Sequence, residues 1–257
     1  MSLDPDSWWV YALLVLAAFG AGVVNSIAGG GTLLTFPALT LILDAQSANI
    51  TSTIALLPGS IAGAWAFRRE LSQARQRAIL LFWPSLIGGI IGASLLIALP
   101  GDVFRVVVPW LILTATLLFL SQPLIAEQVG IGRDHGPPTW GMQAGIIGFQ
   151  LLVAIYGGYF GAGIGILMLS ALALMGMSDL VQMNAVKTFL AALINGVSAV
   201  VFLFSDSVVW HYALVMAISA IAGGYCGAVW ARKLPRLVVR WTIIALGLIL
   251  SVYYLLK

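Results

Sequence analysis

The fold of this chain is decided by residues 22–39, which read GVVNSIAGGGTLLTFPAL. They lie inside an apolar block that runs from Trp8 to Leu43, and the cluster Gly29–Gly31 falls near the middle of that block. The block is far longer than the roughly 20 residues that one helix needs to cross a ~30 Å bilayer core. Glycine is the least favourable ordinary residue in a helix after proline. We therefore predict two short helices joined by an interruption at membrane depth.

A second long apolar block, from Trp140 to Gly176, has the same design. Its stretch 156–169 reads YGGYFGAGIGILML and carries Gly157, Gly158, Gly161, Gly163 and Gly165. Six other apolar blocks are each about 20 residues long, enough for one crossing. They are 47–67, 78–99, 103–122, 180–204, 208–231 and 236–256. Asp44 and Asp179 lie at block edges, where we expect them to cap helices rather than couple an ion. The pattern predicts an all-α, polytopic membrane protein.

The composition supports this class and excludes several others. Of the 257 residues, 61% are apolar and 8% are charged, too few charges to solvate the surface of a soluble enzyme. The 12 basic residues are too few for a phosphate-binding surface, so no nucleic-acid partner is expected. One cysteine and two histidines predict no disulfide, metal site, haem or other cofactor. The acidic start of the chain predicts that the first apolar stretch is kept rather than cleaved.

The two halves of the chain repeat each other. A shift of 135 positions places Asp44 on Asp179 and Asn49 on Asn184. The same shift aligns further matches: Thr53 with Thr188, Gly88-Gly89 with Gly223-Gly224, Leu99-Pro100 with Leu234-Pro235, and Arg105 with Arg240. We therefore divide the chain into a first transmembrane repeat at 1–122, a polar linker at 123–139 and a second repeat at 140–257. The paired glycines at 88–89 and 223–224 are read mainly as sites of close helix packing.

Matching loops of the two repeats carry unlike charge. The loop at 68–77 holds four arginines, whereas its counterpart at 203–212 holds Asp206 and His211. The next pair of loops reverses this, because the second-half copy holds Arg232, Lys233, Arg236 and Arg240. Basic loops stay on the cytoplasmic side. We therefore predict inverted-topology repeats, each a glycine-broken helix pair or hairpin plus three transmembrane helices. A straight count of eight crossings, with parallel halves, is the alternative.

Polar residues inside the blocks predict a binding site. Interrupted helices expose backbone N–H groups that favour anions. We assign substrate binding to Gly29, Gly30, Gly31, Gly161, Gly163 and Gly165 on this basis. Lys187 is the one basic residue well inside a block, and Asn184 and Asn195 lie close to its helix face. Asn49 and Ser52 match Asn184 and Lys187 in the first repeat. The alternatives are glycines that only allow close packing and a lysine that reaches the membrane interface.

The two glycine-rich stretches, together with Asp179, Met183–Lys187 and Asn195-Gly196, resemble the paired signatures of the TauE/SafE sulfite-exporter family, also called the 4-toluene sulfonate uptake permease family. The resemblance covers essentially the whole chain. It implies a bacterial plasma (inner) membrane transporter whose substrate is sulfite, thiosulfate or another small organosulfur anion such as a sulfonate. The signature adds Asn25 and Thr32 to the candidate substrate-binding residues. Ala162 and Ile164 stand where many relatives carry more glycine.

We expect a secondary transporter that exports such an anion by alternating access, with the bilayer and the anion as its partners. A homodimer is left open. The alternatives are a proton- or sodium-coupled uptake carrier, or a channel, for another small organic anion. A membrane-embedded enzyme is not expected, because no histidine lies deep enough to activate Ser26 or Ser60 as a nucleophile.

Overall fold

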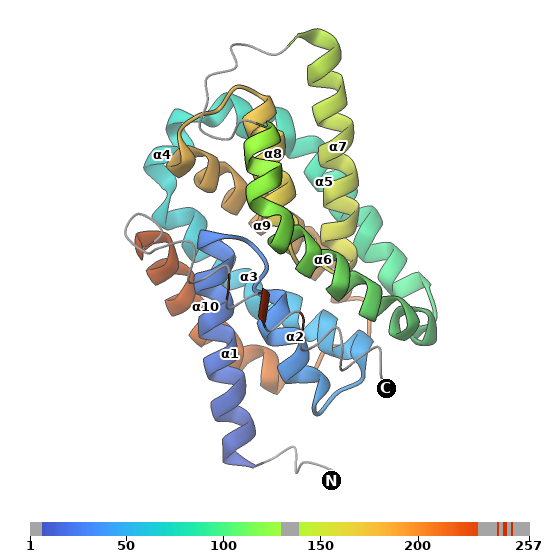
Figure 1. The fold of residues 1–257 in the computed structure, drawn as a ribbon. Helices are drawn as coiled ribbons and strands as arrows, with labels where there is room; N and C mark the ends of the chain where they lie inside the picture. The colour runs from blue at the N-terminus through green and yellow to red at the C-terminus, as the bar shows by residue number, and fades with distance from the viewer. Residues whose placement is uncertain (1–6, 130–138, 231–240, 242–243, 246–247, 249–257) are drawn as a thin grey trace.

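The computed structural model describes residues 7–129, 139–230 and positions 241, 244, 245 and 248. Within these residues the chain is all-helical, with ten helices and no strand (Figure 1). They are α1 (Trp8–Ile27), α2 (Thr32–Thr40), α3 (Ala45–Ala66), α4 (Arg68–Gln73), α5 (Arg75–Ala98), α6 (Gly101–Val129), α7 (Trp140–Tyr159), α8 (Ile164–Leu174), α9 (Leu180–Phe202) and α10 (Trp210–Trp230). The predicted block 236–256 and the repeat matches at 234–240 lie almost entirely outside the described residues.

Both predicted helix interruptions are confirmed. α1 ends at Ile27 and α2 begins at Thr32, and between them Gly29 and Gly30 have φ angles of +72° and +132°. α7 ends at Tyr159 and α8 begins at Ile164, with Gly161 and Gly163 at +82° and +78°. Positive φ is strained for any residue with a Cβ, so these glycines allow the chain to turn where a helix would otherwise continue.

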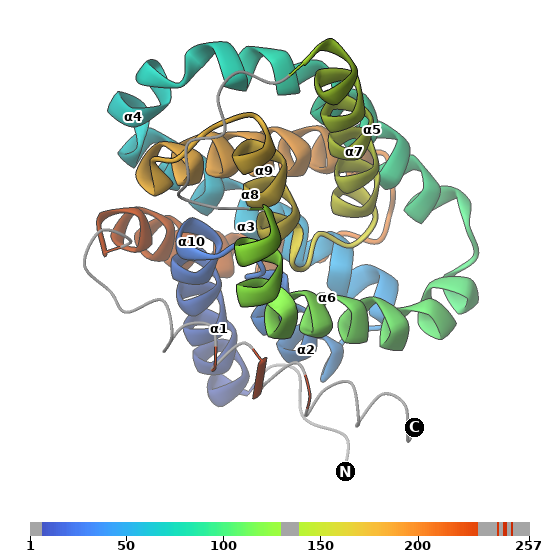
Figure 2. The same ribbon diagram turned by 45° about the horizontal axis from the view of Figure 1, so that its top comes forward.

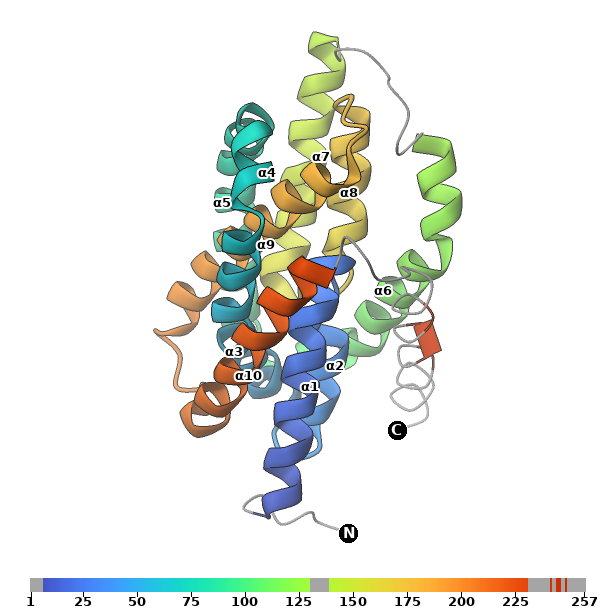
Figure 3. The ribbon, with the colours of Figure 1, turned by 90° about the vertical axis from the view of Figure 1, so that its left-hand side faces the viewer.

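The two interrupted pairs are hairpins that open toward opposite ends of the molecule. In Figure 3 the α1–α2 pair occupies the lower part of the molecule and the α7–α8 pair the upper part. Their turns lie between the two pairs, near the centre of the bundle. The N-terminal end of α1 and the α4 segment lie at opposite ends of the structure (Figure 1).

Helices from the two halves of the sequence are interleaved. α10 packs along α1 and α3, whereas α5 packs along α7 and α9 (Figure 2). α3 and α9 pack against each other and hold the two groups together. Glycines make this packing close: a methyl group on Gly92 would collide with the Ile155 carbonyl oxygen, and one on Gly224 with that of Gly59. The expected packing role of the paired glycines at 88–89 and 223–224 is confirmed.

Six described helices are long and apolar enough to cross a membrane: α1, α5, α6 over Gly101–Ser121, α7, α9 and α10. Large apolar side chains on them face outward, such as Trp83, Val106 and Ile218. α3 is long enough as well, but its buried Asn49, Thr51 and Ser52 lower its hydropathy. This multi-pass membrane protein therefore keeps its most polar long helix inside the bundle.

Two expectations about helix ends have clear outcomes. The Asp44 carboxylate accepts a hydrogen bond from the Ser47 N–H, and that of Asp179 accepts from Val181 and Gln182, so both predicted N-caps are confirmed. The first part of the predicted linker 123–139 is helical, because α6 continues through Pro123 to Val129. A proline removes only one hydrogen bond, and the following Leu, Ala, Glu and Gln favour a helix.

Candidate functional site

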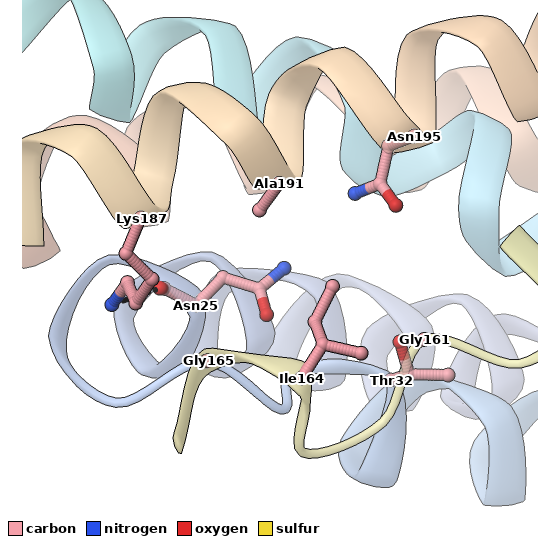
Figure 4. A pocket seen from close by; sticks show the side chains of 9 residues that line it. Asn25, Thr32, Gly161, Ile164, Gly165, Lys187, Ala191 and Asn195 are labelled. Carbon is pink, nitrogen blue, oxygen red and sulfur yellow. Dashed lines mark hydrogen bonds between the residues drawn. The ribbon is translucent and has the colours of Figure 1, made fainter. Parts of the chain in front are cut away.

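A small cavity lies where the two helix interruptions meet. The turns touch each other: a Cβ on Gly29 would lie 2.6 Å from the Gly165 Cα, well inside van der Waals contact. Beside this contact the structure leaves a cavity of about 20 Å³, enough for about one water molecule. Its lining comes from both turns and from α9 (Figure 4): Asn25, Gly29, Thr32, Gly161, Ile164, Gly165, Lys187, Ala191 and Asn195.

The structure brings seven of the thirteen predicted site residues to this cavity. The other six lie around it and do not line it: Gly30, Gly31, Asn49, Ser52, Gly163 and Asn184. Two lining residues were not predicted. Ala191 lies four residues from both Lys187 and Asn195, and this spacing could have identified it as part of the same helix face. Ile164 is apolar, and no spacing or motif in the sequence indicates that it lines the cavity.

Lys187 lies on α9 and is almost fully buried, at 1% exposed, so the alternative of an interfacial lysine is wrong. Its ammonium donates hydrogen bonds to the Asn25 carbonyl oxygen at 3.1 Å and to the Ser26 carbonyl oxygen at 3.2 Å. It also donates to Asn184 Oδ1 at 3.1 Å. The carbonyls belong to the last turn of α1, where helix hydrogen bonding leaves acceptors unpaired. Lys187 therefore caps the negative end of the interrupted α1.

Asn25 closes the first interruption from within. Its Oδ1 accepts hydrogen bonds from the Gly31 N–H at 2.7 Å and from the Gly30 N–H at 3.1 Å. These two amides precede α2 and were predicted to bind the substrate. In the described conformation they bind a neutral side-chain oxygen of the chain itself instead. Figure 4 shows Asn25 between Lys187 and the Ile164–Thr32 side of the cavity.

The second interruption leaves its amides open. Gly163 holds a left-handed conformation at the start of α8, and Tyr156 donates its hydroxyl proton to the Ala162 carbonyl oxygen at 2.7 Å. Among the described residues, neither the Ile164 N–H nor the Gly165 N–H donates a hydrogen bond. Both residues line the cavity. The positive end of α8 thus provides two unpaired backbone donors beside it.

Four polar residues of α3 and α9 support the turns. Asn49 donates from Nδ2 to the Tyr159 carbonyl oxygen at 2.9 Å, which caps the end of α7. Ser52 shares a hydrogen bond of 2.6 Å with the Thr35 hydroxyl of α2. Asn184 holds Lys187, as described above. Asn195 donates to the Ser60 hydroxyl at 3.4 Å across the α3–α9 contact. The first three side chains position the half-helices, whereas Asn195 also faces the cavity.

The groups around this cavity have the chemistry that is suited to an anion. A buried ammonium, unpaired amides and the three polar side chains of Asn25, Thr32 and Asn195 lie around one cavity inside a membrane protein, where such groups act in a low dielectric. Among the described residues, no three His, Cys, Asp or Glu side chains gather closely enough to hold a metal ion. The arrangement suits a small oxyanion.

Comparison with known proteins identifies the family of the chain. The pattern of the family described as "Sulfite exporter TauE/SafE" matches residues 14–254. The chain is 27% identical over 253 residues to the probable membrane transporter protein YfcA of Escherichia coli K12, covering 97% of this chain and 91% of that protein. It is 29% identical over 245 residues to the probable membrane transporter protein ORF9 of a Sinorhizobium species, covering 94% and 90%.

The probable membrane transporter protein YunE of Bacillus subtilis is 26% identical over 264 residues, covering 92% of this chain and 96% of that protein. No solved structure shows a significant match. The family match spans nearly the whole chain, including both interruptions and the buried lysine, so the expected resemblance is confirmed. The chain is a multi-pass membrane transporter that belongs to the TauE/SafE sulfite exporter family.

Proposed function

We propose that this transporter exports a small sulfur-containing anion, such as sulfite, thiosulfate or a sulfonate, across the bacterial plasma membrane by alternating access. One observation carries the proposal: two interrupted helices meet at a cavity that also holds Lys187, the unpaired amides of α8 and the polar groups of Thr32 and Asn195. The family description names sulfite as the exported substrate. Charge-assisted hydrogen bonds to an oxyanion are about twice as strong as neutral ones and help offset dehydration.

The cavity volume bears on how the anion would bind. Room for about one water molecule is too little for a sulfur oxyanion, so the turns must separate when the substrate enters. The Asn25 Oδ1 is the natural group to give way, because an anionic oxygen would bind the Gly30 and Gly31 amides more strongly. A cavity this small is what a carrier needs between its two open states.

Contacts between equivalent residues support inverted repeats. Asn195 bonds to Ser60, which is its own counterpart under the 135-residue shift, and such a contact forms only close to a two-fold axis. Gly88 packs against Ala154, while Gly223 packs against Phe19, the counterpart of Ala154. The same shift thus relates packing partners as well as residue types. Because the two hairpins point in opposite directions, the axis would lie in the membrane plane.

The interleaved packing defines which bodies would move. α1, α2, α3 and α10 form one group of contacts, and α5, α7, α8 and α9 form the other. Each group takes one long helix from the opposite half of the sequence. We therefore place the rocking motion between these two groups rather than between residues 1–122 and 140–257. The α3–α9 contact would serve as the pivot.

The direction of transport can be argued from the membrane potential. Each charge that crosses ~100 mV changes its free energy by about 2.3 kcal/mol, so a dianion that leaves a negative cell interior gains about 4.6 kcal/mol. That energy supports a gradient of roughly a thousandfold. Export therefore needs no coupling ion, whereas uptake would need one.

Purified protein in sealed vesicles tests the proposal. Flux of sulfite, thiosulfate, sulfate and taurine would be measured with an imposed voltage and, separately, with a proton gradient, and binding would be screened by thermal shift. We expect flux of at least one sulfur anion that saturates, follows voltage and shows counterflow. Flux without saturation or counterflow would favour a channel. Flux that requires a proton gradient and ignores voltage would refute uncoupled export.

A further inference from the structure

The surroundings of the Lys187 ammonium resemble a cation-binding site more than an anion-binding one. Three neutral oxygens surround Nζ at 3.1–3.2 Å: two backbone carbonyls from the end of α1 and the Oδ1 of Asn184. The carbonyls belong to an interrupted helix at membrane depth, close to the substrate cavity. In secondary transporters built on broken helices, such carbonyl ends are where a coupling cation is bound.

The burial of Lys187 at the end of α1 explains how its positive charge is stabilised there. The end of α1 concentrates about half a negative charge, and its last carbonyls cannot be left unpaired in a membrane interior. The side chain of Lys187 is 1% exposed, so no bulk water reaches the ammonium. Desolvating the ammonium is costly unless surrounding oxygens replace its hydration shell. The oxygens and the ammonium therefore stabilise each other, as they would with a free cation.

From this geometry we propose that Lys187 is a tethered cation that permanently fills the place of a coupling ion. The inference rests on the proposed transport function and deepens it. The carrier then moves its anion with no accompanying cation, because the cation site never empties during the cycle. Removing the Lys187 side chain creates a vacant site for a small monovalent cation.

A charged side chain caps the C-terminal end of α1, whereas the equivalent end of α7 has a neutral cap. The end of α7 is capped by the neutral amide of Asn49 on α3, the counterpart of Asn184. The position that matches Lys187 is Ser52, and its hydroxyl is hydrogen-bonded to Thr35. Equivalent faces of α3 and α9 thus cap the ends of α7 and α1, but with a neutral amide in one case and an ammonium in the other. A neutral cap suffices for α7, so the ammonium at α1 serves more than backbone pairing.

The test compares three purified variants. Lys187→Ala opens the site, Lys187→Met fills the same space without charge, and Thr188→Val is the matched control. Thr188 is the next residue on α9, equally buried at 2% exposed, and its hydroxyl has no hydrogen-bond partner among the described residues. Melting temperatures are recorded in ammonium, potassium and sodium chloride, each against N-methyl-D-glucamine chloride at equal ionic strength.

We expect the Lys187→Ala protein to melt about 2–4 °C higher with a small cation than with N-methyl-D-glucamine. Ammonium should have the largest effect, since the oxygens are spaced for N–H donors. The wild type, Lys187→Met and Thr188→Val should not distinguish the salts. An Ala variant that is equally stable in all salts would overturn the proposal, and so would an equal response of the Met variant.

Anion flux in wild-type vesicles provides a second readout, which does not depend on the folding of any variant. Wild-type anion flux should be unchanged when sodium or potassium replaces N-methyl-D-glucamine, and a wild-type dependence on a sodium gradient would overturn the proposal. In Lys187→Ala vesicles, flux should fall about tenfold or more and recover in part with added cation. Because the melting experiment needs no substrate, a wrong substrate assignment would leave the cation response in place, so the two failures can be told apart.

Discussion

Gly165→Ala should separate the two helix interruptions and impair transport. An alanine methyl group at this position would lie 2.5 Å from the Ala28 carbonyl oxygen and 2.7 Å from the Gly29 Cα. Both atoms belong to the backbone of the first turn, so no side chain can rotate away. Contacts between carbon atoms are most favourable near 3.5–4.0 Å. The two turns must therefore move apart by roughly 0.8 Å or more.

The free-energy cost of this substitution can be taken from the general behaviour of overpacked protein interiors. Inserting one methyl group into a well-packed site typically costs about 1–3 kcal/mol. If this cost is borne by the closed conformation, the population of that state falls by about 5- to 150-fold. We expect anion flux to fall within this range at equal protein level. The melting temperature should fall by about 2–4 °C for each kcal/mol that the native state loses.

Flux and melting temperature would be measured together with two control substitutions. Gly196→Ala lies on α9 beside the cavity-lining Asn195, but its nearest neighbour, Leu57 Cδ1, would be at an ordinary 3.7 Å. Gly148→Ala lies on α7 with no atom within 4 Å of the new methyl group. Both should remain active, and the second should gain helix stability. A Gly165→Ala protein with wild-type flux and melting temperature would refute the argument that the turns must meet closely.

Three further predictions address the cap, the supporting residues and the topology. Asn25→Asp places a full negative charge on the α2 amides, so binding of sulfite by thermal shift should weaken at least about tenfold without loss of folding; wild-type affinity would contradict this. Asn49→Leu leaves a carbonyl at the end of α7 unpaired, which should destabilise the protein by about 1–3 kcal/mol in a denaturation assay; an unchanged midpoint would show that the cap is dispensable. In a Cys226→Ala background, cysteines at Ser72 and Asp206 should react with an impermeant thiol reagent from opposite sides of the membrane; labelling from one side would exclude inverted repeats.

The interruptions could be predicted because the signal is local. A block too long for one crossing, with glycines near its middle, has few solutions, and Gly29 and Gly163 adopt the conformations that only glycine takes easily. The N-caps were predictable for the same reason, since Asp179 lies next to the amides that it binds. In both cases the deciding partners are within a few residues along the chain.

The roles around the cavity depend on contacts between distant segments. Burial of Lys187 could be expected from its place in an apolar block, but its two carbonyl acceptors lie more than 160 residues away on α1. Ser52 was assigned to the substrate because it is polar and matches Lys187 in the first repeat. Nothing in its own sequence shows that the hydroxyl of Thr35 reaches it first. Asn25 likewise lies in the signature stretch, but the sequence does not reveal that its side chain accepts hydrogen bonds from the nearby glycine amides.

The arrangement of helix ends at the centre of the molecule explains why a single lysine is enough to make the site positively charged. Four half-helix ends meet there: the C-terminal ends of α1 and α7 and the N-terminal ends of α2 and α8. Their partial charges, about half a unit each and opposite in pairs, nearly cancel. The net charge of the site is then set by Lys187, which adds one positive charge held within the bundle. An anion that enters meets this charge without having to bring a cation, and an empty site keeps the ammonium satisfied by the end of α1. In the proposed mechanism, selectivity for anions depends on the charge of Lys187, whereas the glycine turns supply the space and the backbone N–H donors.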